Sequence, residues 1–128
     1  MIAGWFRSLF TKKKAVGQFQ VPWVAYIANQ DGPAEQELKK WLTETFLKTP
    51  AVRRGYLVRV RYGTGDKEEI ALCIAATEPD EGSLVRTIGA HIAKVFAVTV
   101  HLDIMFLSKK EELEIQQTCT PFFQKTEF

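Results

Sequence analysis

The chain has 128 residues, of which 46% are hydrophobic and 25% are charged. This length and composition fit one compact soluble domain with a short appendage, and they disfavour a disordered chain, a fibrous repeat and a disulfide scaffold. The net charge is +2, but residues 1–14 hold four basic and no acidic side chains, so the rest of the chain has 13 basic against 15 acidic residues. This slightly acidic body predicts no nucleic-acid partner, because nucleic-acid binding needs clustered basic side chains.

The first eleven residues combine an apolar face with a basic end, and we expect a short N-terminal helix there. Lys12, Lys13 and Lys14 follow the apolar side chains, which recur at helical spacing and are Ile2, Trp5, Phe6, Leu9 and Phe10. Two interpretations stay open: the face packs on this domain or a second copy, or it makes a weak contact with an anionic membrane surface. The positive charge follows the apolar part, unlike in a secretory signal. We expect residues 1–18 to be a segment and linker before a single domain at 19–128.

A strand and a helix are predicted next. Residues 19–29 are rich in aromatic and β-branched side chains, which is typical of a strand. Asp31 or Gly32 can cap a helix that has Pro33 in its first position, and apolar spacing continues this helix over about residues 33–48.

Two further strands are predicted with a hairpin turn at residues 63–66. Residues 56–62 alternate, with tyrosine and valine on one face and Leu57, Arg59 and Arg61 on the other, which predicts a half-buried strand. The apolar run at residues 69–76 suits a central strand buried on both faces.

The remaining sequence predicts a helix, a strand and a short helix. The helix opens at Pro79, and its apolar stripe reaches Phe96. Residues 98–107 alternate as a strand, and Ser108 with Glu111 has the spacing of a capping box for a helix at about 109–117.

The order of these elements indicates an α+β fold of the ferredoxin-like, split β-α-β-β-α-β type. We expect a four-stranded antiparallel sheet with the first and third strands central and two helices on one face. Side chains predicted on the open face are Val24, Tyr26, Leu57 and Met105. That face needs a cover, and the candidates are the N-terminal segment, the last helix with Phe122 and Phe123, or a second copy. We therefore expect a homodimer or another protein partner.

Four short motifs resemble a known family. They are Gly32-Pro33-Ala34-Glu35, Leu38-Lys39-Lys40-Trp41-Leu42, Thr49-Pro50-Ala51-Val52 just before Gly55-Tyr56-Leu57-Val58-Arg59-Val60, and the closing Thr120-Pro121-Phe122-Phe123. With them, the chain from the first strand to Phe123 resembles the C-terminal domain of the bacterial enhanced serine sensitivity protein family (SseB C-terminal-like). The resemblance implies a bacterial cytoplasmic protein with no catalytic constellation to carry over. It also implies a preceding domain in full-length members, where this chain has the segment from Trp5 to Lys14.

Cysteine and histidine give little sign of catalysis or metal binding. Cys73 lies in an apolar run and Cys119 in a polar stretch, and no CxxC or CxxH spacing is present. We expect two reduced thiols, no metal and no cofactor. His91 lies at the border of a helical apolar stripe, and no local nucleophile signature surrounds either histidine.

The polar face of the sheet supplies the candidate ligand or anion site, which consists of Arg59, Arg61, His101 and Asp103. A phosphate or carboxylate could dock there. The preferred alternative is that the arginines protect an edge strand from aggregation by their charge.

Taken together, the sequence predicts a non-enzymatic protein-interaction or regulatory module with no catalytic residues. A peripheral membrane adaptor is the first alternative, and a small-ligand sensor or enzyme is the second. The candidate interaction residues are those of the apolar N-terminal face and the lysines that follow it.

Overall fold

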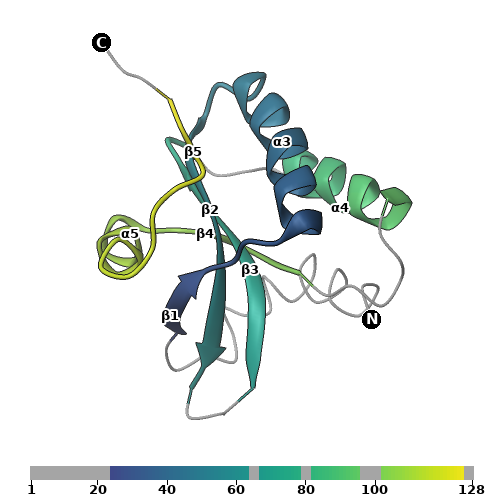
Figure 1. The fold of residues 1–128 in the computed structure, drawn as a ribbon. Helices are drawn as coiled ribbons and strands as arrows, with labels where there is room; N and C mark the ends of the chain where they lie inside the picture. The colour runs from purple at the N-terminus through teal and green to yellow at the C-terminus, as the bar shows by residue number, and fades with distance from the viewer. Residues whose placement is uncertain (1–23, 64–66, 79–81, 96–101, 126–128) are drawn as a thin grey trace.

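The computed structural model describes residues 24–63, 67–78, 82–95 and 102–125, and it confirms an α+β fold (Figure 1). In chain order the elements are β1 (Val24–Asn29), α3 (Pro33–Leu47), β2 (Val52–Tyr62), β3 (Glu68–Ala76), α4 (Ser83–Val95), β4 (Asp103–Phe106), α5 (Lys109–Ile115) and β5 (Phe123–Gln124). The predicted N-terminal segment, residues 19–23 of the first predicted strand, residues 64–66 of the hairpin turn, residues 79–81 and residues 98–101 lie outside the described residues. The second helix was predicted to open at Pro79, and as described it begins at Ser83.

Local sequence signals place most helix starts correctly. Pro33 begins α3 directly after Gly32, as the turn sequence predicts. The capping box at the start of α5 is complete: the Glu111 backbone N–H donates to Ser108 Oγ at 3.1 Å, and the Ser108 backbone N–H donates to Glu111 Oε1 at 2.8 Å. β2 begins at Val52, four residues before the predicted strand, because residues 52–55 pair with the end of β3.

The strand order differs from the ferredoxin-like prediction. The sheet runs β1-β2-β3-β4, so β2 and β3 are the central strands and β1 lies beyond β2. β1 and β3 both pair with β2 antiparallel, whereas β3 and β4 are parallel, so the sheet is mixed. The crossover through α4 returns the chain to the end at which β3 began, which makes β4 parallel to β3. The prediction was wrong here because side-chain alternation is the same in parallel and antiparallel strands.

One edge of β2 pairs with β3, and the other edge is shared by two short strands. β1 pairs with residues 58–62 of β2, and β5 pairs with Arg54 and Gly55. The Lys125 backbone N–H extends this contact by donating to the Arg53 carbonyl at 2.9 Å. β5 was not predicted, because two residues are too few to show a periodicity.

β2 is thus paired on both sides. The interpretation that Arg59 and Arg61 protect an edge strand is therefore wrong.

The larger core lies between the sheet and the pair of helices α3 and α4. Its most buried members include Leu42 and Phe46 of α3, Ile88 and Ile92 of α4, and Leu57 of β2. The expectation that Leu57 faces the open side is wrong. Phe122 and Phe123 also pack on this core, where their ring centroids lie 6.2 and 5.4 Å from that of Phe46.

A second core lies on the opposite face of the sheet, which we call the second face. Side chains of β2 and β3 on this face pack with Ile115 of α5 and with Cys119; they are Tyr56, Val58, Val60, Ala71 and Cys73. The predicted alternation along β2 is confirmed, as is the placement of Val24, Tyr26 and Met105 at the rim of this face. Of the covers predicted for this face, the last helix, α5, does pack on it (Figure 1). Phe122 and Phe123, which were predicted to pack with it, lie instead on the larger core.

Gly55 lies where β2 passes closest to the aromatic side chains of the larger core. A Cβ at this position would meet a ring carbon of Phe46 at 2.7 Å and one of Phe122 at 3.2 Å. We predict that Gly55→Ala lowers the free energy of unfolding by about 1–3 kcal/mol through overpacking, measured by urea denaturation.

Gly32→Ala is the matched control. A Cβ there would meet the carboxylate end of Glu35, which can rotate away, and the backbone of Gly32 is extended. A loss below about 1 kcal/mol is expected, in the range of a changed N-cap. Equal losses for the two variants would contradict the packing described around Gly55.

Candidate functional site

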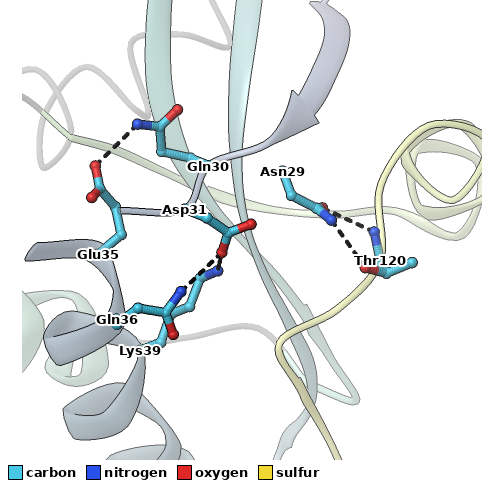
Figure 2. Close-up of polar contacts among 7 residues, drawn as sticks. All are labelled: Asn29, Gln30, Asp31, Glu35, Gln36, Lys39 and Thr120. Carbon is cyan, nitrogen blue, oxygen red and sulfur yellow. Dashed lines mark hydrogen bonds and ion pairs between the residues drawn. The ribbon is translucent and has the colours of Figure 1, made fainter. Parts of the chain in front are cut away.

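Polar side chains gather where β1 passes into α3. Asp31, in the turn, accepts hydrogen bonds from Gln36 at 3.1 Å and from Lys39 (Figure 2). The hydrogen bond from Lys39 lowers the pKa of the Asp31 carboxyl. Gly32 is the N-cap residue and has no side chain to cap the helix. The turn is held instead by the Asp31 carboxylate, which accepts hydrogen bonds from side chains in the first two turns of α3.

Gln30 links this turn to the central strand β2. Its Nε2 donates to Glu35 Oε2 at 3.0 Å, and its Oε1 accepts from Arg59 Nε at 3.1 Å (Figure 2 shows the Glu35 contact). Its backbone N–H also donates to the Leu57 carbonyl at 2.9 Å. Three contacts hold Gln30 in place, so its side-chain carbonyl has a defined position beside Arg59.

Two arginines of β2 share one carboxylate of β3. Arg59 Nη1 lies 3.4 Å from Glu68 Oε1, and Arg61 Nη2 lies 2.9 Å from Glu68 Oε2. The side chains of Arg59, Arg61 and Glu68 are 42%, 39% and 34% exposed. Arg61 Nε is nevertheless buried and has no hydrogen-bond partner. We call Gln30, Arg59, Arg61 and Glu68 the arginine cluster.

The predicted grouping of four ligand residues does not form as a unit. Arg59 and Arg61 lie together, but Asp103 points to the second face, where its carboxylate accepts a hydrogen bond from Tyr62 Oη at 2.7 Å. Alternation explains this, because the next residue, Ile104, is buried in the larger core on the other side of the sheet. Burial, and then the charge of Asp103, raise the pKa of Tyr62, which keeps its hydroxyl a donor. His101 lies outside the described residues.

A second polar cluster attaches α5 to the second face, and we call it the α5 latch. The Glu112 carboxylate accepts hydrogen bonds from both Nε and Nη2 of Arg54, the latter at 3.1 Å, and from Tyr56 Oη at 2.7 Å. Gln116 Nε2 donates to the same hydroxyl at 2.9 Å. The Arg54 hydrogen bond is the main reason that the pKa of Glu112 is lowered, and burial is the main reason that the pKa of Tyr56 is raised to about 12.

The latch was missed from the sequence, although one signal was available. Glu112 and Gln116 are four residues apart on a short helix, so they share a face one turn apart. Arg54 and Tyr56 are two apart on a strand and also share a face. Nothing in the sequence shows that these two faces meet.

The chain after α5 is tied to β1 by side-chain hydrogen bonds. Asn29 Nδ2 donates to Thr120 Oγ1 at 3.1 Å, and the Thr120 backbone N–H donates back to Asn29 Oδ1 at 3.0 Å (Figure 2). Thr118 Oγ1 donates to the Tyr26 carbonyl at 3.0 Å. These contacts guide the chain past the end of β1 to the place where β5 joins β2.

The two thiols are free, in agreement with the sequence prediction, and both are buried, although Cys119 comes from a polar stretch of sequence. Burial raises the pKa of Cys73 and also that of Cys119, so both remain protonated and weakly nucleophilic at neutral pH. His91 stacks on Trp41, with ring centroids 3.8 Å apart, and burial lowers its pKa. Its place at the border of the α4 stripe is therefore confirmed as a packing position.

The described part of the chain contains neither a cluster of metal-ligating side chains nor a helix that could cross a membrane. In residues 24–63, 67–78, 82–95 and 102–125, no group of three or more His, Cys, Asp or Glu side chains is placed to hold a metal ion. None of the helices in this part of the chain combines the length and the apolar composition needed for a bilayer crossing.

Comparison with known proteins identifies a family model that covers most of the chain. A protein-family model described as the SseB protein C-terminal domain matches residues 30–125. This range contains every described element from α3 to β5, and with them the arginine cluster and the α5 latch. No curated protein and no solved structure matches the chain significantly. The predicted interaction residues, namely Trp5, Phe6, Leu9, Phe10, Lys12, Lys13 and Lys14, lie outside both the match and the described residues.

The latch predicts a pH-dependent stability. The Glu112 side chain is 12% exposed and that of Arg54 is 28% exposed. Glu112→Gln should lower the free energy of unfolding by roughly 1.5–3 kcal/mol at pH 7, the range for hydrogen bonds to charged groups. Because folding lowers the pKa of Glu112, its contribution is complete at neutral pH and fades as the pH falls below about 4–5.

Urea denaturation at pH 7 and at low pH measures this effect, with Glu114→Gln, an exposed position on the same helix, as the control. The difference between wild type and Glu112→Gln should shrink on acidification, and the control should stay near wild type at both pH values. A Glu112→Gln loss that is small at pH 7 or independent of pH would contradict the latch.

Proposed function

The chain belongs to the SseB protein C-terminal domain family, and on this premise we propose that it is a non-enzymatic protein-interaction or regulatory module of the bacterial cytoplasm. The observation that most supports this proposal is the state of the described groups that could act as nucleophiles. Burial raises the pKa of both thiols, and the hydroxyl groups of Tyr56 and Tyr62 donate hydrogen bonds to carboxylates inside the domain. Each of these groups serves packing or internal hydrogen bonding.

The proposed first partner is a second copy of the chain, and the proposed contact is the apolar N-terminal sequence. The large apolar side chains exposed on the described surface are Leu47, Val95 and Leu113, which lie singly on α3, α4 and α5. Single exposed apolar residues are common on monomers and do not make an interface. The first eleven residues, by contrast, hold five large apolar side chains at helical spacing.

A peripheral membrane adaptor is the second candidate, and a specific sequence feature favours it. Lys12, Lys13 and Lys14 directly follow the apolar side chains. Each basic residue near an anionic leaflet adds about 1 kcal/mol of attraction. Three lysines act usefully only together with insertion of the apolar residues.

Self-association is testable on the full chain by size-exclusion chromatography with light scattering. We predict a dimer mass for the wild type and a monomer mass for Trp5→Glu with Phe6→Glu, because charges on the apolar stripe oppose its burial. The matched control is Ser8→Glu with Thr11→Glu, which adds the same charge off the stripe and should keep the dimer mass. A monomeric wild type, or a dimer that survives the Trp5 and Phe6 substitutions, would overturn the dimer proposal.

Membrane association is tested separately by flotation with vesicles that contain anionic lipid. If the second candidate is right, the wild type floats and the variant with Trp5→Glu and Phe6→Glu does not, whereas Ser8→Glu with Thr11→Glu floats less strongly than wild type. Flotation should also weaken as salt is added, because salt screens the lysine contribution. A wild type that stays at the bottom of the gradient at low salt removes this candidate.

A further inference from the structure

We propose that the arginine cluster is a binding site for an oxyanion of the carboxylate or phosphate class, and that Glu68 is an internal competitor that occupies it in the free protein. This goes beyond the proposed protein-binding function and does not depend on it. In this cluster two guanidinium groups share one carboxylate, the buried Nε of Arg61 has no acceptor, and small side chains lie opposite both arginines.

Arg59 and Arg61 are held side by side on the central strand. They are two residues apart, so both point to the face of the sheet that carries Leu57. Each donates to a different oxygen of the same carboxylate, that of Glu68. The guanidinium groups are therefore spaced to hold the two oxygens of one anion, and within the described part of the chain both pair with a single carboxylate.

Only one of the two donor atoms on the Nε–Nη2 side of Arg61 has an acceptor. Nε and Nη2 of an arginine form a fork that matches two oxygens of one anion. In the α5 latch this fork of Arg54 is filled, because Nε and Nη2 donate to the two oxygens of Glu112. In Arg61 the Nη2 donates to Glu68 but the buried Nε has no partner. An oxyanion that replaced Glu68 could satisfy both donors.

The side chains that lie opposite the two arginines on the neighbouring strand are small. Opposite Arg59 and Arg61 on β1 lie Ala28 and Ala25, the smallest side chains that could occupy these register positions without glycine. The other carboxylate near the cluster, that of Glu35, accepts its hydrogen bond from Gln30. Gln30 also accepts a hydrogen bond from Arg59 Nε. The Nη1 and Nη2 groups of Arg59 therefore remain for the shared anion.

A surface ion pair alone does not explain this arrangement. The three charged side chains are between 34% and 42% exposed, and pairs of that exposure add little stability. The unmatched Nε adds a cost, because a buried donor without an acceptor is unfavourable. β2 is also not an edge strand, so protection against edge-to-edge pairing is not the role of the arginines.

The test is a titration of the full chain with inorganic phosphate and, separately, with acetate, at constant ionic strength set with chloride. The signals to follow are the Nε–H resonances of Arg59 and Arg61 in nitrogen-15 NMR spectra. We expect saturable shifts with at least one of the two anions, and the anion that binds more tightly identifies the ligand class. Shifts that do not saturate with either anion, or that chloride reproduces, would overturn the proposal.

Four variants make the test specific. Glu68→Gln should tighten binding several-fold, because it removes the competitor, whereas Arg61→Gln should abolish saturable binding. Arg61→Lys keeps the charge without the fork and should bind at least several-fold more weakly than wild type. Lys67→Gln removes a neighbouring charge that is 83% exposed and should leave binding close to wild type. Equal weakening by Lys67→Gln and Arg61→Gln, or weaker binding in a folded Glu68→Gln variant, would contradict the site.

Discussion

The attachment of α5 to the second face of the sheet determines how the chain after β4 covers that face and reaches β5. A helix of seven residues is not stable alone in water, so α5 exists because the sheet holds it. Burial of Ile115 contributes about 2 kcal/mol, and the hydrogen bonds that Glu112 accepts from Arg54 and Tyr56 fix the orientation of the helix. The same attachment directs the chain through Thr120 to β5, which completes the edge of β2. Without α5, the second face would expose a continuous apolar surface.

Because α5 covers the second face, we expect a partner to bind at another part of the chain. A bare second face would by itself favour a dimer, because a large exposed apolar surface is unfavourable in water. With Ile115 and Cys119 packed on Val58, Val60 and Cys73, the chain supplies that cover itself at this part of the sheet. The proposed contact with a second copy therefore depends on the apolar N-terminal sequence, and the proposed anion site lies on the opposite face, where Arg59 and Arg61 project beside the start of α3.

Features set by short stretches of sequence were predictable, and features set by the meeting of distant stretches were not. The bounds of α3, the capping box of α5 and the alternation along β2 follow from spacing and capping chemistry over a few residues. The order of the strands was not predictable, because side-chain alternation does not show which strands are neighbours in the sheet or whether they run parallel. The candidate site divides in the same way. That Arg59 and Arg61 lie side by side was predictable from their spacing. The contact of both with Glu68, the separation of Asp103 from them and the whole α5 latch depend on contacts between strands and helices that are far apart in the chain.

The most direct test of the central claim is an isotope-filtered NOE experiment on a mixture of labelled and unlabelled full-length chains. It separates contacts within one chain from contacts between two chains. If α5 covers the second face of its own sheet, NOEs link the Ile115 methyl groups to Val58 and Val60 within a single labelled chain and are absent between labelled and unlabelled chains. NOEs from Ile115 that appear only between chains, or no NOEs from Ile115 to β2 at all, would contradict this structure.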